Sequence, residues 1–202
     1  LQSDVLGARA LFSEALTSFR ESEDEYNVAV TAGTLAEAEF RCGDAEAAAR
    51  AGRESLAAAR ARRLDTRVVA WLLCNVTAFC LELGEYEEAR AYARETLGLR
   101  LDAQIDIYVA FVLQHLAAVA ALRPAEATGP QNERQRLAAT LLGFVDARLK
   151  ELDVTREYTD QYLYDKILAA LRAGPEAAAL GQSMAAGETL SEERAVALAL
   201  TV

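Results

Sequence analysis

Hydrophobic residues recur along most of the chain at intervals of three and four positions, the spacing of one face of an α-helix. The pattern predicts helices over residues 27–42, 66–83, 105–122, 133–148, 155–172, 176–186 and 191–200. Gly43 and Gly84 stand where one helix must stop in a left-handed turn before the next begins. Gly187 predicts another stop, and Ser191 is a typical N-cap for the last helix. The stretch 123–131 carries two prolines and a glycine, which indicates an exposed loop.

The pattern also repeats about every forty residues. Residues 3–16 return in similar form at 43–56 and 84–97, with Ala8, Ala48 and Ala89 at equivalent positions. These copies alternate with the long helices, so the repeating unit is a helical hairpin. A single hairpin cannot bury its apolar face, and we therefore expect the hairpins to stack.

The third copy carries the motif Gly-Glu-Tyr-x-x-Ala at residues 84–89, followed by Thr96-Leu97 and preceded by Asn75. These positions resemble the tetratricopeptide repeats, although the period is longer than the usual 34 residues or so and no proline closes each unit. The resemblance implies an all-α fold, a right-handed α-α superhelix or tetratricopeptide-like solenoid with a C-terminal helical cap. We expect the repeats over residues 1–151 and the cap over 152–202.

The C-terminal part carries a second resemblance. Leu141-Leu142-Gly143 and the segment 187–200 are similar to the extreme C-termini of bacterial multidomain ATPase-type regulators. In that group a nucleotide-binding switch domain precedes the repeats, and the output domain is a LuxR-type or winged-helix DNA-binding domain or an adenylate/guanylate cyclase. The resemblance, together with a chain that begins at Leu1, predicts a piece of a longer protein.

Charge and composition narrow the expected partners. The chain is 52% hydrophobic with a formal net charge of −10, which disfavours direct binding to nucleic acids and to anionic membranes. The most apolar run, 108–122, is too short to span a bilayer and contains Gln114 and His115. Cys42, Cys74 and Cys80 lack metal-binding spacing and indicate reduced, packed thiols of a cytoplasmic protein, with Cys74 and Cys80 placed too poorly to bridge.

Motifs for catalysis are missing from the sequence. It has no phosphate-binding glycine loop, no nucleophile elbow, and only one histidine for a zinc site, so we expect no enzyme, no cofactor and no metal. The acidic stretch 21–25 lacks the alternation and central glycine of a calcium loop and is typical of a solvated helix–helix connection. A helical enzyme with His115 as its base is the alternative.

Aligning the first helices of the hairpins gives a candidate binding surface. In tetratricopeptide proteins these positions face the concave groove, and here they are Val30, Thr34, Glu37, Arg41, Trp71, Cys74, Asn75, Phe111, Gln114 and His115. Trp71 and Phe111 would form an aromatic shelf, with Asn75, Gln114 and His115 as polar readers of an extended peptide or a partner helix. The alternative is that both aromatic residues simply pack between helices. Arg41 is the only lysine or arginine at these positions, which disfavours a clamp for acidic peptides.

We therefore expect a non-catalytic sensor or scaffold region of a bacterial signalling protein, with a transcriptional regulator as the first choice. It would bind a protein, a peptide or a small inducer and bias an upstream switch domain of the same polypeptide. The regulatory region of an adenylate/guanylate cyclase and a free-standing tetratricopeptide adaptor are the alternatives. Association into a homodimer through an apolar end of the stack is a further expectation.

Overall fold

A computed structural model describes residues 2–99, 106–124 and 130–202 of the chain. Within these residues the protein consists of ten α-helices and one 3-10 turn without any strand, which confirms the all-α prediction. The α-helices are α1 (Gln2–Glu21), α2 (Glu25–Arg41), α3 (Ala45–Ala61), α4 (Thr66–Glu82), α5 (Tyr86–Gly98), α6 (Asp106–Leu122), α7 (Gln131–Glu151), α8 (Tyr158–Ala173), α9 (Leu180–Glu188) and α10 (Glu192–Ala199), and the turn is η1 (Ala177–Ala179).

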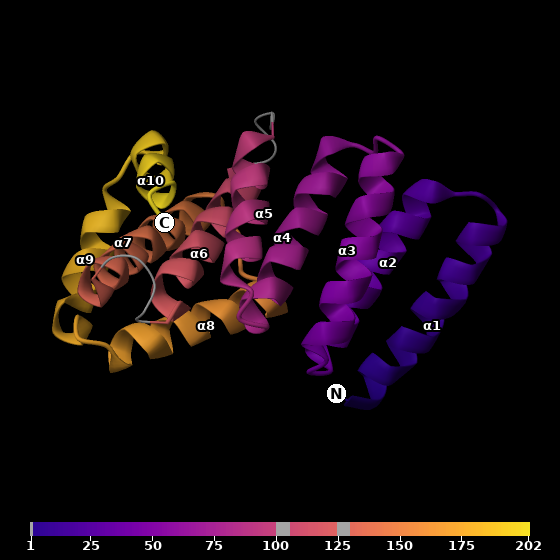
Figure 1. The fold of residues 1–202 in the computed structure, drawn as a ribbon, viewed down its shortest axis with the longest axis horizontal. Helices are drawn as coiled ribbons and strands as arrows, with labels where there is room; N and C mark the ends of the chain where they lie inside the picture. The colour runs from indigo at the N-terminus through magenta and orange to yellow at the C-terminus, as the bar shows by residue number, and fades with distance from the viewer. Residues whose placement is uncertain (1, 100–105, 125–129) are drawn as a thin grey trace.

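Helices that are neighbours in sequence pack as neighbours in space and form a row of pairs, α2 with α3, α4 with α5, and α6 with α7 (Figure 1). Gly43 and Gly84 adopt φ angles of 86° and 75°, which confirms the left-handed turns that end α2 and α4. The acidic stretch around residue 23 is the connection between α1 and α2, as predicted. Asp44 caps α3, because its carboxylate accepts a hydrogen bond from the backbone N–H of Ala47 at 2.9 Å.

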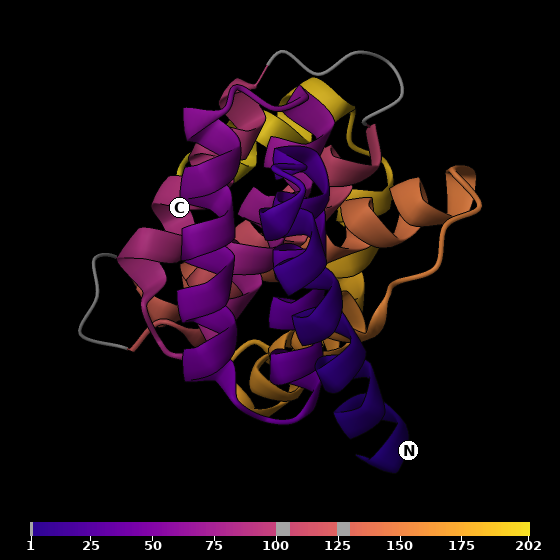
Figure 2. The ribbon, with the colours of Figure 1, turned by 90° about the vertical axis from the view of Figure 1, so that its right-hand side faces the viewer.

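Small residues set how closely the pairs approach one another. The repeated Ala48 and Ala89 are fully buried, whereas Ala8 in α1 is only partly buried. The difference arises because α1 is the first helix of the row and packs against α2 on one side, with its N-terminal part extending past the other helices (Figure 2). A Cβ atom on Gly52 of α3 would lie 2.9 Å from the side chain of Val76 in α4, so this contact between pairs requires glycine.

The helices after α7 fold back on the third pair. α9 packs along α7, and a Cβ atom on Gly143 would lie 1.9 Å from the carbonyl oxygen of Met184. A Cβ atom on Gly187 would lie 1.9 Å from the carbonyl oxygen of Thr140. Helix α9 ends at Glu188, one residue after the predicted stop at Gly187, and the glycine itself serves the close crossing of two backbones.

The chain returns to the second pair at its C-terminal end. Ser191 caps α10 as predicted, with its hydroxyl accepting a hydrogen bond from the backbone N–H of Arg194 at 3.4 Å. The guanidinium of Arg94 in α5 donates to the carbonyl oxygens of Leu200 and Val202 at 2.8 and 2.9 Å. These bonds connect the last residues of the chain to a helix more than a hundred positions earlier.

Helix α8 takes a different course from the pairs. It contacts α6 and reaches α4 and α2, and Figure 1 shows it running across the pairs rather than extending their row. It begins at Tyr158, three residues later than predicted. Leu163, Ile167 and Leu171 lie on one face of α8 and are buried, so apolar packing stabilises this crossing position.

One hydrophobic cluster extends from α2 to α10. Helices on both sides of the expected boundary between residues 151 and 152 contribute to it, and the division into repeats and cap stays a prediction. The centre of the predicted loop, residues 125–129, lies outside the described residues. Searched over the described residues, no helix combines the length and the apolar character that crossing a membrane would need.

Candidate functional site

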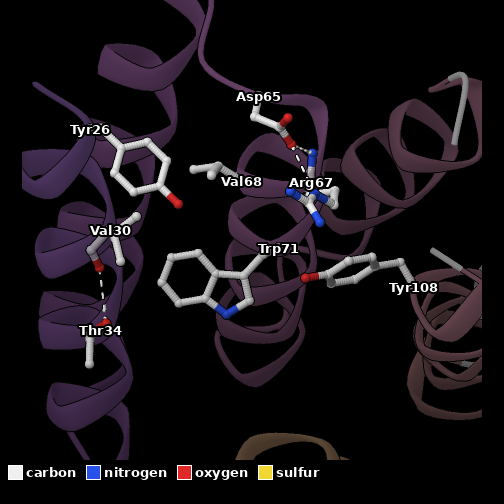
Figure 3. A pocket seen from close by; sticks show the side chains of 8 residues that line it. All are labelled: Tyr26, Val30, Thr34, Asp65, Arg67, Val68, Trp71 and Tyr108. Atoms are coloured by element: carbon white, nitrogen blue, oxygen red, sulfur yellow. Dashed lines mark hydrogen bonds and ion pairs between the residues drawn. The ribbon is translucent and has the colours of Figure 1, made fainter. Parts of the chain in front are cut away.

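The candidate site lies on the surface that α2, α4 and α6 share, here named the α2–α4–α6 face. A pocket of about 590 Å³ opens on it between the three helices (Figure 3). Its lining residues are Tyr26, Val30 and Thr34 of α2, Asp65, Arg67, Val68 and Trp71 at or within α4, and Tyr108 of α6. The structure thus brings together three of the residues predicted from the repeat, namely Val30, Thr34 and Trp71.

A smaller pocket of about 160 Å³ adjoins the first, because Trp71 and Tyr108 line both. Four more predicted residues line it, together with residues of the segment that leads into α8. The full lining is Glu37, Trp71, Cys74, Asn75, Ile107, Tyr108, Phe111, Val154, Thr155, Glu157, Thr159 and Asp160. The two pockets adjoin at Trp71 and Tyr108 and are here together named the groove.

Trp71 owes its position to a glycine on the facing helix. A Cβ atom on Gly33 of α2 would lie 2.6 Å from the indole ring of Trp71 and 2.6 Å from the side chain of Leu72. The indole ring is half-buried between α2 and α4, so it both packs and lines the groove. Figure 3 shows the hydroxyl groups of Tyr26 and Tyr108 pointing toward it from either side.

The smaller pocket contains a carboxyl group in an acidic setting. Burial raises the pKa of Glu37 above its ordinary value; a hydrogen bond from the side-chain amide of Asn75 opposes this, and the negative charges of Glu157 and Asp160 add to it. Burial also raises the pKa of Tyr108, to about 12, so its phenol stays neutral. Within the described residues Glu37 has no ion-pair partner, and its carboxylate accepts the hydrogen bond from Asn75.

The rim of the larger pocket is electrically balanced. Asp65 caps α4 by accepting the backbone N–H of Arg67 at 2.8 Å, and the guanidinium of Arg67 lies 3.3 Å from the same carboxylate. These hydrogen bonds lower the pKa of Asp65. Both side chains are exposed, so their pairing adds little to stability but cancels charge at the mouth of the pocket.

The third pair presents its part of the face differently. Gln114 and His115 are fully buried because α8 and the residues before it cover them. Gln114 donates to the carbonyl oxygen of Asp160 at 2.8 Å and accepts from Arg156 at 2.7 Å, and His115 Nε2 lies 3.5 Å from the Asp160 carboxylate. In this structure both residues contact α8 where we expected them to read a ligand in an open groove.

Arg41 lies away from the groove. Its guanidinium lies over the ring of Tyr158 at 5.0 Å, beside a separate pocket of about 200 Å³. The neighbouring Glu82 accepts from Tyr162 at 3.0 Å and pairs with Lys166 at 2.7 Å, which holds α8 against the end of α4. At this end of the face the side chain of Arg41 therefore contacts α8 and does not line the groove.

The cysteines and the acids of α5 offer no separate site. All three cysteines are free; Cys74 and Cys80 are buried as expected, whereas Cys42 is exposed and the prediction that it packs is wrong because it ends α2 at a surface turn. Burial raises the pKa of Cys80 to about 12. Its sulfur lies close to Glu85 and Glu88, but the guanidinium of Arg53 fills that cluster by pairing with both carboxylates.

Comparison with family models, curated proteins and solved structures gives no match for this chain.

Several lining residues escaped the sequence alignment. Tyr26 lies one helical turn before Val30, and Tyr108 lies three positions before Phe111, so extending the repeat by one turn would have found both. Glu157, Asp160 and the other residues before and within α8 have no counterpart in the repeat. Only the fold brings them to the groove.

Proposed function

We propose that this chain is a non-catalytic binding region whose groove on the α2–α4–α6 face takes an extended peptide segment of a partner protein. The observation that carries the proposal is the pair of adjoining pockets that meet at Trp71 and Tyr108. Aromatic walls with a few polar groups are typical of sites that bind peptides and small ligands, and the larger pocket has a volume in the usual range.

The repeat supports a tetratricopeptide-like right-handed superhelix, in which the α2–α4–α6 face is the concave side. In such an arrangement each pair adds a strip of surface to a continuous groove. The proposed role is a sensor or scaffold in a bacterial signalling protein, with a transcriptional regulator as the first choice. Peptide binding would bias a switch domain of the same polypeptide by favouring one of its two states.

Selection of peptides from a random displayed library against the full chain tests this function. Peptides selected by the wild-type chain should lose at least about tenfold in affinity for Trp71→Ala and for Tyr108→Ala, since buried aromatic contacts dominate such interfaces. Leu11→Ala is the matched control, because Leu11 is an exposed apolar residue on α1. Circular dichroism would verify that each variant folds. Equal affinity of the selected peptides for all four proteins would contradict the proposal.

A further inference from the structure

The charges around the groove are unequal between its two compartments. Asp65 and Arg67 balance each other at the mouth of the larger pocket. The smaller pocket is lined by three carboxyl-bearing residues, Glu37, Glu157 and Asp160, and no lysine or arginine lines it. Its lining, all of it within the described residues, therefore presents net negative charge.

Two further arginines, one in the segment before α8 and one in contact with α8, are already engaged. Arg156 donates to Asp146 at 2.5 Å and to Gln114 at 2.7 Å. Arg41 lies over the ring of Tyr158 and lines another pocket. Neither can turn toward Glu37 without giving up these contacts. His115 Nε2 lies 3.5 Å from the Asp160 carboxylate, so among the described residues Glu37 and Glu157 are the lining carboxyl groups without an ion-pair partner.

Aromatic rings complete the surroundings of these carboxyl groups. Trp71, Tyr108 and Phe111 line the same pocket as Glu37. The faces of aromatic rings attract ammonium and guanidinium groups, and tryptophan does so most strongly. A carboxylate behind such rings is the complement of a cation on an apolar stem, and the side chains of lysine and arginine have that form.

On the basis of the peptide-binding function proposed above, we infer that the bound segment is basic and that a lysine or arginine side chain of it enters the smaller pocket. The stem passes between Trp71 and Tyr108, and the cationic head meets the carboxylate of Glu37 with Glu157 and Asp160 nearby. The neutral phenol of Tyr108 and the amide of Asn75 remain as polar groups around the cation. The formal net charge of −10 on the chain adds a long-range attraction for such a peptide.

The single tryptophan of the chain makes this inference measurable, because the fluorescence of Trp71 reports directly on the junction of the two pockets. The probes are a short capped peptide of alternating glycine and arginine and the same peptide with citrulline, which keeps the shape of arginine without its charge. The arginine peptide should change Trp71 emission and bind at least about tenfold more tightly than the citrulline peptide. The difference should shrink at high salt, because salt screens the attraction between charges.

Glu37→Gln is the decisive variant, since glutamine keeps the shape of the side chain and can still accept from Asn75. It should weaken the arginine peptide by about tenfold and leave the citrulline peptide unchanged. Glu46→Gln is the control: Glu46 is exposed on α3 away from the groove, and the change in net charge is the same. Thermal unfolding would show that both variants fold.

Each other outcome counts against a defined part of the inference. The inference that a basic side chain enters the smaller pocket is overturned if the arginine and citrulline peptides bind equally. It is also overturned if Glu37→Gln and Glu46→Gln have equal effects. In both cases the proposed peptide groove is unaffected. Tighter binding of free spermidine than of the arginine peptide identifies a small polyamine as the cation and overturns the peptide source. No response to the arginine peptide also overturns the inference, while the library selection decides separately on the proposed function.

Discussion

The first two pairs and the third pair contain equivalent helices with unequal surfaces. On α2 and α4 the aligned residues Val30, Thr34 and Trp71 are partly exposed and line a pocket. On α6 the equivalent residues Phe111 and His115 are buried, and His115 lies under α8. Equivalent positions in a repeat therefore share a direction but not an exposure, because exposure depends on what lies above them.

The cause of the difference is the packing around α6. All residues of α6 from 110 to 120 are buried, and this helix contacts α4, α5, α7, α8 and α10. In α2, buried residues alternate with half-buried ones, since its face meets only the N-terminal end of α8. The groove consequently runs from the open pairs to the edge of the covered one.

The largest effect should come from breaking the close crossing that supports the covered half. Gly143→Ala places a Cβ atom 1.9 Å from the backbone carbonyl of Met184, and neither backbone can move without shifting a helix. We expect a loss of about 3 kcal/mol in the free energy of unfolding, measured by chemical denaturation.

Gly181→Ala on α9 is the matched control, because an added Cβ atom there meets nothing within 4 Å. It should stabilise the protein slightly, since alanine favours the helix by up to about 1 kcal/mol over glycine. If Gly143→Ala lowered the free energy of unfolding no more than Gly181→Ala does, the role of the close crossing between α7 and α9 would be contradicted.

A comparable or slightly smaller effect should follow from loosening α8. Leu163 is fully buried, and Leu163→Ala should cost about 2 to 3 kcal/mol in the free energy of unfolding through the cavity it leaves. The exposed Gln161→Ala on the same helix should stay within about 0.5 kcal/mol of the wild type. In Leu163→Ala, amide hydrogen exchange should accelerate more in α8 and α6 than in α2, relative to the wild type. A uniform acceleration along the chain would contradict the difference between the covered and the open pairs.

The smallest effect concerns Glu37 in the open half. Its pKa is raised in the folded protein by burial, so the stability associated with its protonated form is complete at acidic pH and is lost as pH rises through the folded pKa. Glu157 and Asp160 face it from the α8 side, Trp71 and Asn75 from α4, and Tyr108 from α6.

Glu37→Gln should therefore be as stable as the wild type at about pH 4 and more stable at neutral pH. Thermal unfolding at several pH values measures the difference. A wild-type protein that is more stable than this variant at neutral pH would show that a cation inside the protein already pairs with Glu37.

Much of the fold follows from local pattern. Gly43 and Gly84 mark turns that any observer of the repeat could place, because a left-handed residue at a helix end needs glycine whatever surrounds it. Gly187 shows the limit of the same reasoning. The local pattern predicts only a helix end there. The role of Gly187 depends on the backbone carbonyl of Thr140, almost fifty positions away, and the residues next to Gly187 do not reveal that contact.

The sequence by itself determined the helical class, the forty-residue hairpin period and the direction in which Val30, Trp71 and Phe111 point, since these depend on neighbours three or four positions away. Tertiary structure alone decided which part of that face is open. The path of α8 results from the burial of Leu163 and Ile167 against distant helices, and it both closes the face over Gln114 and brings Asp160 to Glu37. Exposure and charge at the groove are thus properties of the packed chain.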